Sequence, residues 1–254
     1  MEQTKKDSLT VKTSNNRDEM GRIAAKDGAE RINALLAEQP EVNIIFASAP
    51  SQDEMLRYLA NEPVDWTRIN AFHMDEYVGI SPDAPQCFGY YLKIRLFDLK
   101  PLKRVFYLGD FTSATPNPAE CERYAALLKQ YPPDIVFMGI GENGHIAFND
   151  PHVADFNDPL MVKIVDLDSA CRRQQVNDGC FATLDDVPTH AYTLTVPTLT
   201  DAKYHFCTVP SKTKAQAVYN TLNGAITTAC PAGILRTCDN AILYLDADSA
   251  SLLL

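Results

Sequence analysis

The sequence predicts an α/β fold in which helices cover both faces of an open, mostly parallel sheet. Three observations lead to this prediction. Short apolar runs alternate along the chain with longer stretches whose apolar residues recur at helical spacing. The apolar runs are typical of strands buried in a parallel sheet. No Pro/Ser-rich linker or long repeat divides the 254 residues, so we expect one domain over 1–254, with residues 1–15 flexible.

The first half of the chain contains two strand–helix units. Residues 18–36 place Ile23, Ile32 and Leu36 at helical spacing with charged residues between them, which predicts an amphipathic helix. The apolar run over 42–47 predicts a buried strand that leads through a tight loop into a helix. The expected elements after this strand are a helix over 55–60, a strand over 68–73, a helix over 88–97 and a short strand over 105–108.

The second half continues the alternation. Asn117 is a good N-cap and Pro118 a good first-turn residue, so they predict a helix over 118–130. The run over 134–139 is the clearest strand and ends in a glycine-rich loop. Strands and helices that alternate in this way predict a Rossmann-like sheet. The remaining expected elements are a strand over 204–209, a helix over 213–222 and a last strand over 241–245.

Composition indicates a folded cytoplasmic protein. Hydrophobic residues make up 46% of the chain and charged residues 22%, close to the averages for globular proteins. No apolar run approaches the roughly 20 residues that a membrane helix requires. The first seven residues are polar and lack the apolar core of a signal peptide. We therefore expect a cytoplasmic protein without a membrane partner.

Charge and cysteine content exclude several classes of function. The formal net charge of −10 argues against a nucleic-acid partner, which would need a basic face. An anionic substrate would have to be held by local donors, because the overall field opposes it. The seven cysteines form no Cys-x-x-Cys pair, so we expect reduced, mostly buried thiols and neither a zinc ribbon nor a thioredoxin-type motif.

Three polar clusters directly follow predicted strands: residues 48–52, 75–77 and 141–150. In open parallel sheets the ligand binds outside the carboxyl ends of the strands. We therefore expect the three clusters to meet at one edge of the sheet and to form the functional site there.

The first chemically informative cluster is Asp75 with Glu76 and Tyr77. A carboxylate at a strand end could act as a general base for a proton beside a sugar carbonyl, although acidic residues at strand ends also cap helices or face water. The second cluster is the loop over 139–150, where glycines leave backbone N–H groups free and His145 lies between Asn143 and Asp150.

Two other interpretations of the loop over 139–150 are less favoured. The spacing Gly-x-Gly-x-x-Gly matches a short dinucleotide fingerprint, but the loop comes late in the chain and no clear helix opens after it. A metal could use His145, His152 and Asp150, but no pair has the His-x-x-x-His spacing and no cysteine is well placed. We therefore expect neither a nucleotide cofactor nor a metal.

Residues 48–52 and Lys214 are candidates for binding a phosphate. Ser48 and Ser51 offer hydroxyls between a strand and a helix, with Ala49 and Gln52 beside them, although a plain helix cap is an equally good explanation. Lys214 follows a later strand and could supply a fixed positive charge to the same group, although many such lysines are only solvated.

Residues 72–79 (Phe-His-Met-Asp-Glu-Tyr-Val-Gly) and 141–149 (Gly-Glu-Asn-Gly-His-Ile-Ala-Phe-Asn) together resemble the glucosamine-6-phosphate deaminase family. The similarity continues through residues 187–188, 194–199 and 214–215. The broader superfamily includes 6-phosphogluconolactonases. The resemblance implies an enzyme without a cofactor that converts a 2-amino-2-deoxyhexose 6-phosphate to a ketohexose 6-phosphate and ammonia.

The resemblance also implies a role for individual residues. Asp75 corresponds to the base that moves the C2 proton, and His145 to the histidine that assists ring opening. Asn143 and Asp150 correspond to the positions that support this imidazole, and Lys214 to a phosphate ligand. The remaining substrate contacts implied by the resemblance are Ser48, Ala49, Ser51, Gln52, Glu76, Gly144 and an arginine that is either Arg172 or Arg173.

The sequence departs from the family pattern at several positions. Asn143 cannot carry a charge, Asp150 is one methylene shorter than the usual Glu, and Asp158 in a second Phe-Asn-Asp-Pro copy is a rival carboxylate. Ala49-Pro50 replaces the usual Gly-Gly of the phosphate loop. The gluco and galacto epimers of the substrate, a sugar-phosphate sensor without catalysis, and a 6-phosphogluconolactonase-like hydrolase stay open, as does a homo-oligomer.

Overall fold

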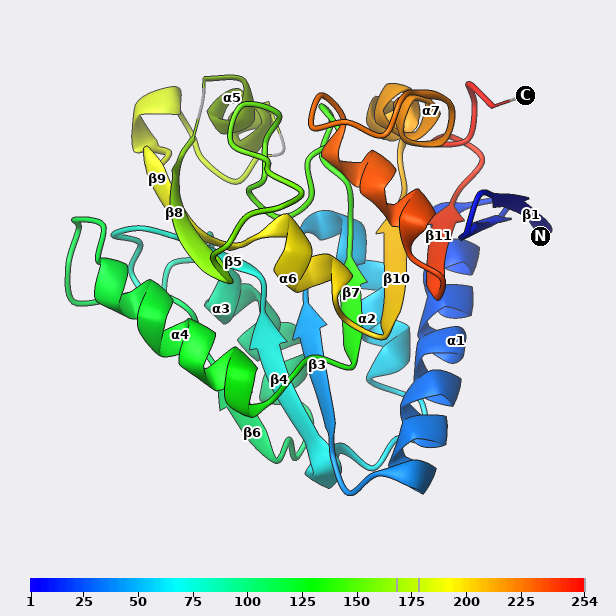
Figure 1. The fold of residues 1–254 in the computed structure, drawn as a ribbon, viewed down its shortest axis with the longest axis horizontal. Helices are drawn as coiled ribbons and strands as arrows, with labels where there is room; N and C mark the ends of the chain where they lie inside the picture. Colours follow the sequence, from blue (N-terminus) through cyan, green and yellow to red (C-terminus); the bar gives the residue numbers. More distant parts are fainter. Residues whose placement is uncertain (168, 178, 254) are drawn as a thin grey trace.

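The computed structural model describes residues 1–167, 169–177 and 179–253. An eight-stranded sheet runs through the molecule in the order β1-β2-β11-β10-β7-β3-β4-β6 (Figure 1). All neighbouring pairs are parallel except β1 and β2. The strands are β1 (Glu2–Lys6), β2 (Leu9–Thr13), β3 (Val42–Phe46), β4 (Ile69–His73), β6 (Arg104–Phe106), β7 (Ile135–Met138), β10 (Tyr204–Val209) and β11 (Ala241–Leu245).

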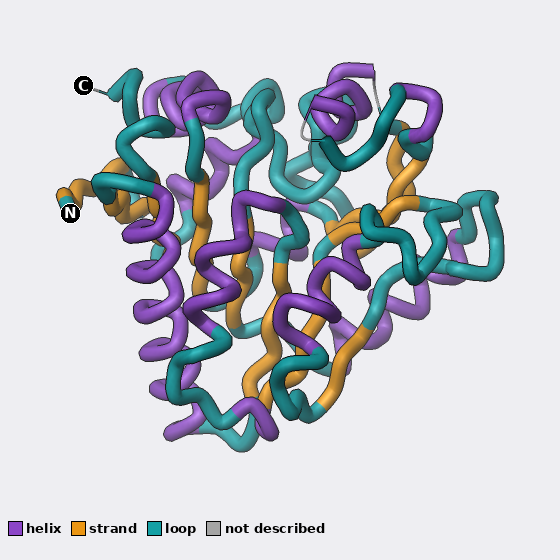
Figure 2. Tube along the Cα trace, turned by 180° about the vertical axis from the view of Figure 1, so that it is seen from behind, coloured by secondary structure: helices purple, strands orange, loops and turns teal. Residues whose placement is uncertain are grey.

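Helices cover both faces of this sheet, as the sequence predicts. Viewed from behind (Figure 2), α1 (Arg17–Glu38), α2 (Asp53–Leu59) and α3 (Phe88–Leu92) lie across one face, where they bury one apolar cluster. The front of Figure 1 shows α4 (Pro118–Gln130) and α6 (Val196–Thr200) on the other face, over a second apolar cluster. The described chain contains no helix with both the length and the apolar character needed to cross a bilayer.

Most predicted elements are confirmed to within a few residues. Asn117 caps α4 by accepting the N–H of Ala119 at 3.1 Å, and Pro118 is its first residue. The helix expected over 88–97 is divided into α3 and a π-helical turn, Lys93–Phe97. The helix expected over 213–222 begins as a 3-10 turn, Lys212–Lys214, and continues as α7 (Ala215–Asn223).

The N-terminal residues differ from the expectation of a flexible segment. β1 and β2 form an antiparallel hairpin, and β2 pairs in parallel with β11. Leu9 and Val11 are buried in the core, whereas every residue from Glu2 to Lys5 is exposed. Two buried apolar side chains are too few to predict a strand with assurance from local sequence. β2 is stabilised instead by pairing with β11, a strand more than 200 residues away in the chain.

A second, three-stranded antiparallel sheet was not predicted. It consists of β5 (Asp75–Tyr77), β9 (His190–Leu194) and β8 (Val162–Asp166). α5 (Ser169–Asn177) follows β8, and Figure 1 shows it beyond the upper edge of the main sheet. The small sheet matters for function because β5 follows β4 after one residue and holds Asp75 at the edge of the main sheet.

Candidate active site

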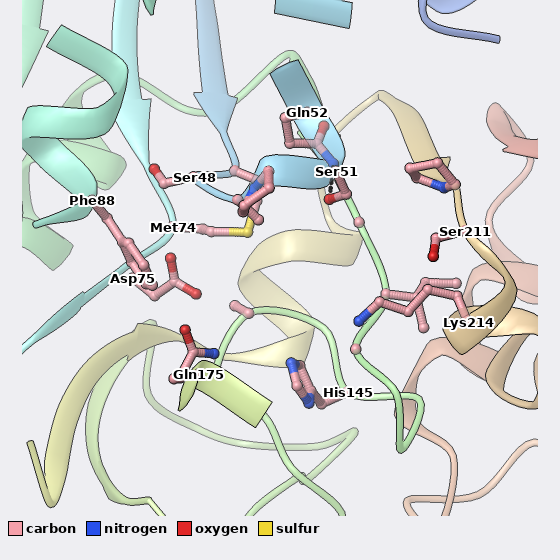
Figure 3. A pocket seen from close by; sticks show the side chains of 18 of the residues that line it. Ser48, Ser51, Gln52, Met74, Asp75, Phe88, His145, Gln175, Ser211 and Lys214 are labelled. Atoms are coloured by element: carbon pink, nitrogen blue, oxygen red, sulfur yellow. Dashed lines mark hydrogen bonds between the residues drawn. The ribbon is translucent and has the colours of Figure 1, made fainter. Parts of the chain in front are cut away.

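A cavity of about 230 Å³ lies at the carboxyl ends of β3, β4, β7 and β10. Residues from all three polar clusters of the sequence line it: 48–52, Asp75, and 141 and 145 from the glycine-rich loop. Figure 3 shows Asp75, Phe88 and Gln175 at one end, Ser51, Ser211 and Lys214 at the other, and His145 between them. The cavity therefore has an acidic end and a cationic end.

Asp75 is 7% exposed and lies where β4 passes into β5. Burial, together with the neighbouring charge of Glu76, raises the pKa of Asp75 well above its ordinary value. A carboxylate that is poorly solvated in its charged form accepts a proton more readily. Asp75 is thus suited to act as a general base toward a ligand in the cavity.

His73 holds the backbone beside Asp75. The N–H of Leu108 donates to its Nε2 at 2.9 Å, so Nδ1 carries the proton and donates to the carbonyl of Asp75 at 2.9 Å. Burial lowers the pKa of His73 to about 4, which keeps this imidazole neutral at physiological pH. Sequence reasoning missed this role, although the position of His73 in the Phe-His-Met-Asp motif was visible.

Glu76 lies outside the lining of the cavity. Successive side chains of a strand point to opposite faces, and its carboxylate accepts the N–H of Gly89 at 2.9 Å and the thiol of Cys87 at 3.2 Å. Burial raises the pKa of Glu76 to about 7, although these hydrogen bonds oppose the shift. The residue implied as a substrate ligand instead fixes the start of α3, and through it Phe88.

The loop over 139–150 presents the His145 ring to the cavity. Nδ1 of His145 lies 2.8 Å from Asn143 Oδ1 and 3.1 Å from Asp150 Oδ1, and Asn143 Nδ2 donates to the same Asp150 oxygen at 2.7 Å. Both Nδ1 neighbours are acceptors, so Nδ1 carries a proton and Nε2 is the nitrogen available to a ligand. Gly141 is required here, because a Cβ would lie 2.0 Å from Cε1 of His145.

Asp150 is fully buried beneath His145. Burial alone raises its pKa, but the hydrogen bond and charge of His145, with hydrogen bonds from Asn143 and Cys171, lower the pKa to about 2. Asp150 is therefore a carboxylate at any physiological pH. It can orient the His145 ring and stabilise the imidazolium form.

The opposite end of the cavity contains hydroxyl and amide groups. Gln52 donates to Ser51 Oγ at 3.0 Å and accepts from Thr208 Oγ1 at 2.8 Å, so β10 fixes the loop after β3. Ser48 also lines the cavity, but Figure 3 shows it on the side of Met74 and Phe88; within the described residues its buried hydroxyl has no hydrogen-bond partner. Lys214 adds a positive charge, which makes this end suitable for an anionic group.

Several predicted substrate residues do not line the cavity. Arg172 donates instead to the carbonyls of Leu184 at 2.6 Å and Val187 at 2.9 Å, and Arg173 is exposed. Asn143 and Asp150 instead contact the His145 ring on the side away from the cavity. Gly144 has φ +84°, and its carbonyl accepts the N–H of Ala232. The lining of the cavity also includes residues that the sequence did not indicate, among them Arg17, Phe88, Gln175 and Cys180.

No metal-binding arrangement of three or more His, Cys, Asp or Glu side chains is found in the described part of the chain. His145 and Asp150 bind each other, and His152 lies 3.3 Å from the carbonyl of Asp166 through Nε2. The side chains that line the cavity include a carboxylate, an imidazole, two cations and hydroxyls.

Comparisons with known proteins identify relatives of the whole chain. The glucosamine-6-phosphate deaminase of Listeria innocua is 35% identical over 214 residues, which cover 84% of this chain and 88% of that protein. A solved structure of a monomeric glucosamine-6-phosphate deaminase is 29% identical and superposes with a TM-score of 0.84, covering 95% of this chain and 99% of that one. The 6-phosphogluconolactonase of Thermotoga maritima shares the fold, with a TM-score of 0.77 at 18% identity over 94% of this chain and 99% of its own.

Residues 15–244 match the family described as glucosamine-6-phosphate isomerases/6-phosphogluconolactonase. The match spans nearly the whole chain and confirms the resemblance inferred from residues 72–79 and 141–149. This chain is a member of the glucosamine-6-phosphate isomerase/6-phosphogluconolactonase family.

Proposed function

We propose that this protein is a glucosamine-6-phosphate deaminase, which converts its substrate to fructose 6-phosphate and ammonia. The observation on which the proposal rests is the placement of Asp75 and His145 on one cavity whose far end is cationic. The relatives named glucosamine-6-phosphate deaminase support the same activity.

The two ends of the cavity give the substrate one orientation. In the proposed complex the phosphate binds at the end with Ser51 and Lys214, and C1 and C2 face Asp75. Figure 3 shows the side chains at these two ends. An attraction to Lys214 and a repulsion from Asp75 disfavour the reverse orientation. The C2–H bond then faces the carboxylate that is to take its proton.

His145 and Asp75 act in sequence. Nε2 of His145 moves a proton between the ring oxygen and the anomeric hydroxyl, which opens the sugar, while Asp150 stabilises the imidazolium that forms. Asp75 takes the C2 proton, giving an enolamine, and returns it to C1. Water then hydrolyses the resulting ketimine and releases ammonia.

A lactonase has no need of a base at C2. The position of Asp75 on the cavity wall therefore favours the deaminase over a 6-phosphogluconolactonase-like hydrolase. A sugar-phosphate sensor without catalysis would bind the substrate and leave it unchanged. Direct measurement of turnover separates the three functions.

The test is ammonia release from glucosamine 6-phosphate and galactosamine 6-phosphate in parallel, with a chelator present. We expect turnover of glucosamine 6-phosphate that is lost in Asp75→Asn, while the variant still binds the substrate. Binding without ammonia release by the wild type would contradict the proposal and indicate a sensor. Hydrolysis of 6-phosphogluconolactone without ammonia release would indicate the lactonase.

The cell compartment and the assembly remain predictions. We infer a cytoplasmic enzyme, which fits a chain with seven cysteines, five of them buried. The homo-oligomer expected from the resemblance is tested by sedimentation velocity, and the similar solved structure is that of a monomeric enzyme.

A further inference from the structure

Arg17 lines the same cavity, although it lies far from every motif of the sequence. It is the first residue of α1, and the cavity brings it together with the loop after β3 and with Lys214. Within the described ranges, one arginine, Arg17, and one lysine, Lys214, line the cavity. The cavity lining thus includes one positive charge from the start of α1 and one from the turn that precedes α7.

The geometry of Arg17 leaves hydrogen-bond donors for a ligand. Its Nε donates to Glu54 at 2.7 Å and one Nη2 hydrogen to the carbonyl of Pro50. A guanidinium has five N–H groups, so three have no partner within the described part of the chain. The contacts with Glu54 and Pro50 fix the planar group beside the loop, which reduces the entropy lost when it binds an anion.

The arginines on α5 do not supply this charge. Arg172 is occupied by the carbonyls of Leu184 and Val187, and Arg173 is exposed and outside the cavity lining. Ala49 and Pro50 also stand where two glycines are usual, and Pro50 has no N–H to offer an anion. Within the described residues, Arg17 is thus the arginine that lines the cavity and can add a second positive charge to that of Lys214.

We propose that Arg17 is a phosphate-binding residue of the active site and, with Lys214, clamps the phosphate of the substrate. This inference rests on the proposed function for the identity of the substrate, but the phosphate contact itself is tested without turnover. A planar guanidinium binds phosphate oxygens through two parallel N–H···O bonds, which a lysine cannot reproduce.

The experiment measures binding of inorganic phosphate by calorimetry and, separately, the kinetics with glucosamine 6-phosphate. For Arg17→Met we expect the Kd for phosphate to rise about 10- to 100-fold, as for the loss of a charge-assisted hydrogen-bonded pair. KM should rise by a similar factor, with kcat changed less than about threefold. Arg17→Lys should recover only part of the affinity. Arg22→Met, an exposed position on the same helix, is the matched control and should behave as the wild type.

Glu54→Gln separates phosphate binding from a merely structural ion pair. This variant breaks the charge pair with Arg17 but keeps the guanidinium and removes a nearby negative charge, so phosphate should bind at least as tightly as in the wild type. Equal weakening of phosphate binding in Arg17→Met and Glu54→Gln would overturn the inference, and so would unchanged binding in Arg17→Met.

The failure of this inference is distinguishable from the failure of the proposed function. A wild type that releases ammonia while Arg17→Met keeps its KM and its phosphate affinity overturns only the role of Arg17. A wild type that binds phosphate without releasing ammonia, and loses that binding in Arg17→Met, overturns only the deaminase.

Discussion

The substitution Asp150→Asn tests whether the carboxylate beneath His145 contributes to catalysis. Asp150 is fully buried, and its interactions with His145, Asn143 and Cys171 lower its pKa from 3.8 to about 2. The difference corresponds to about 2 kcal/mol of preferential interaction with the charged carboxylate. An asparagine keeps the size and one acceptor oxygen but loses the charge that stabilises the imidazolium of His145.

We expect kcat/KM for glucosamine 6-phosphate to fall about 10- to 100-fold in Asp150→Asn, because losing a hydrogen bond between charged groups in the transition state costs about 1.5–3 kcal/mol. The affinity for inorganic phosphate should stay unchanged, since Asp150 lies beneath His145 and outside the cavity lining. Ammonia release measured at neutral pH gives the rate, and calorimetry gives the phosphate affinity.

Asp158→Asn is the matched control. Asp158 stands in the second copy of the Phe-Asn-Asp-Pro motif and pairs with Lys163 Nζ at 2.8 Å, away from the cavity. It should keep kcat/KM near the wild-type value. Retention of more than a third of the wild-type kcat/KM in Asp150→Asn would refute the reasoning, and so would an equal loss in Asp158→Asn.

Three further predictions concern other residues of the site. Asp75→Asn should lower kcat by at least about 10²–10⁴-fold. Burial raises the pKa of Asp75 in the folded protein, so its carboxylate destabilises the fold as pH rises. Asp75→Asn should therefore unfold at a higher temperature than the wild type at pH 8. A lower melting temperature of the variant would contradict the argument. Gly141→Ala should lower turnover at least about 10²-fold without weakening phosphate binding, because the new Cβ would lie 2.0 Å from the His145 ring; a fully active variant would show that the ring sits elsewhere. Burial lowers the pKa of His73 from 6.5 to about 4 in the folded protein. The unfolded chain therefore binds a proton at this position before the folded protein does. As a result, the free energy of unfolding is unaffected above pH 6.5 and falls by about 3 kcal/mol as pH falls to 4. Denaturant titrations of the wild type and His73→Gln should show this loss only in the wild type, and parallel pH profiles would contradict it.

Local sequence was sufficient for most strands of the main sheet, but not for β1 and β2. The strands β3, β4, β7, β10 and β11 are short apolar runs that have no stable alternative to burial between helices, so their pattern predicts both element and environment. The loop over 139–150 was also predictable, because Gly141 and Gly144 have backbone or packing requirements that few other residues meet. Asp75 and His145 follow these strands directly, so the fold class itself brings them to one edge.

Local sequence contains a weak signal for two features that differ from the predictions, the position of Glu76 and the hairpin of β1 and β2. Glu76 follows Asp75 on a strand, and strand alternation already places adjacent side chains on opposite faces. If Asp75 faces the cavity, Glu76 cannot, and it binds the backbone at the start of α3 instead. The hairpin of β1 and β2 had a similar signal in the alternation of Leu9 and Val11.

The sequence by itself determined the alternating α/β fold and the two motifs that hold Asp75 and His145, because both depend on residues that are neighbours in the chain. Only the tertiary structure decided which cations line the cavity. Arg172 forms hydrogen bonds with carbonyls of its own segment, whereas Arg17 reaches the loop after β3 because α1 packs against α2. The physical reason is that a long side chain has many conformations of similar energy, and contacts with residues distant in sequence select one of them.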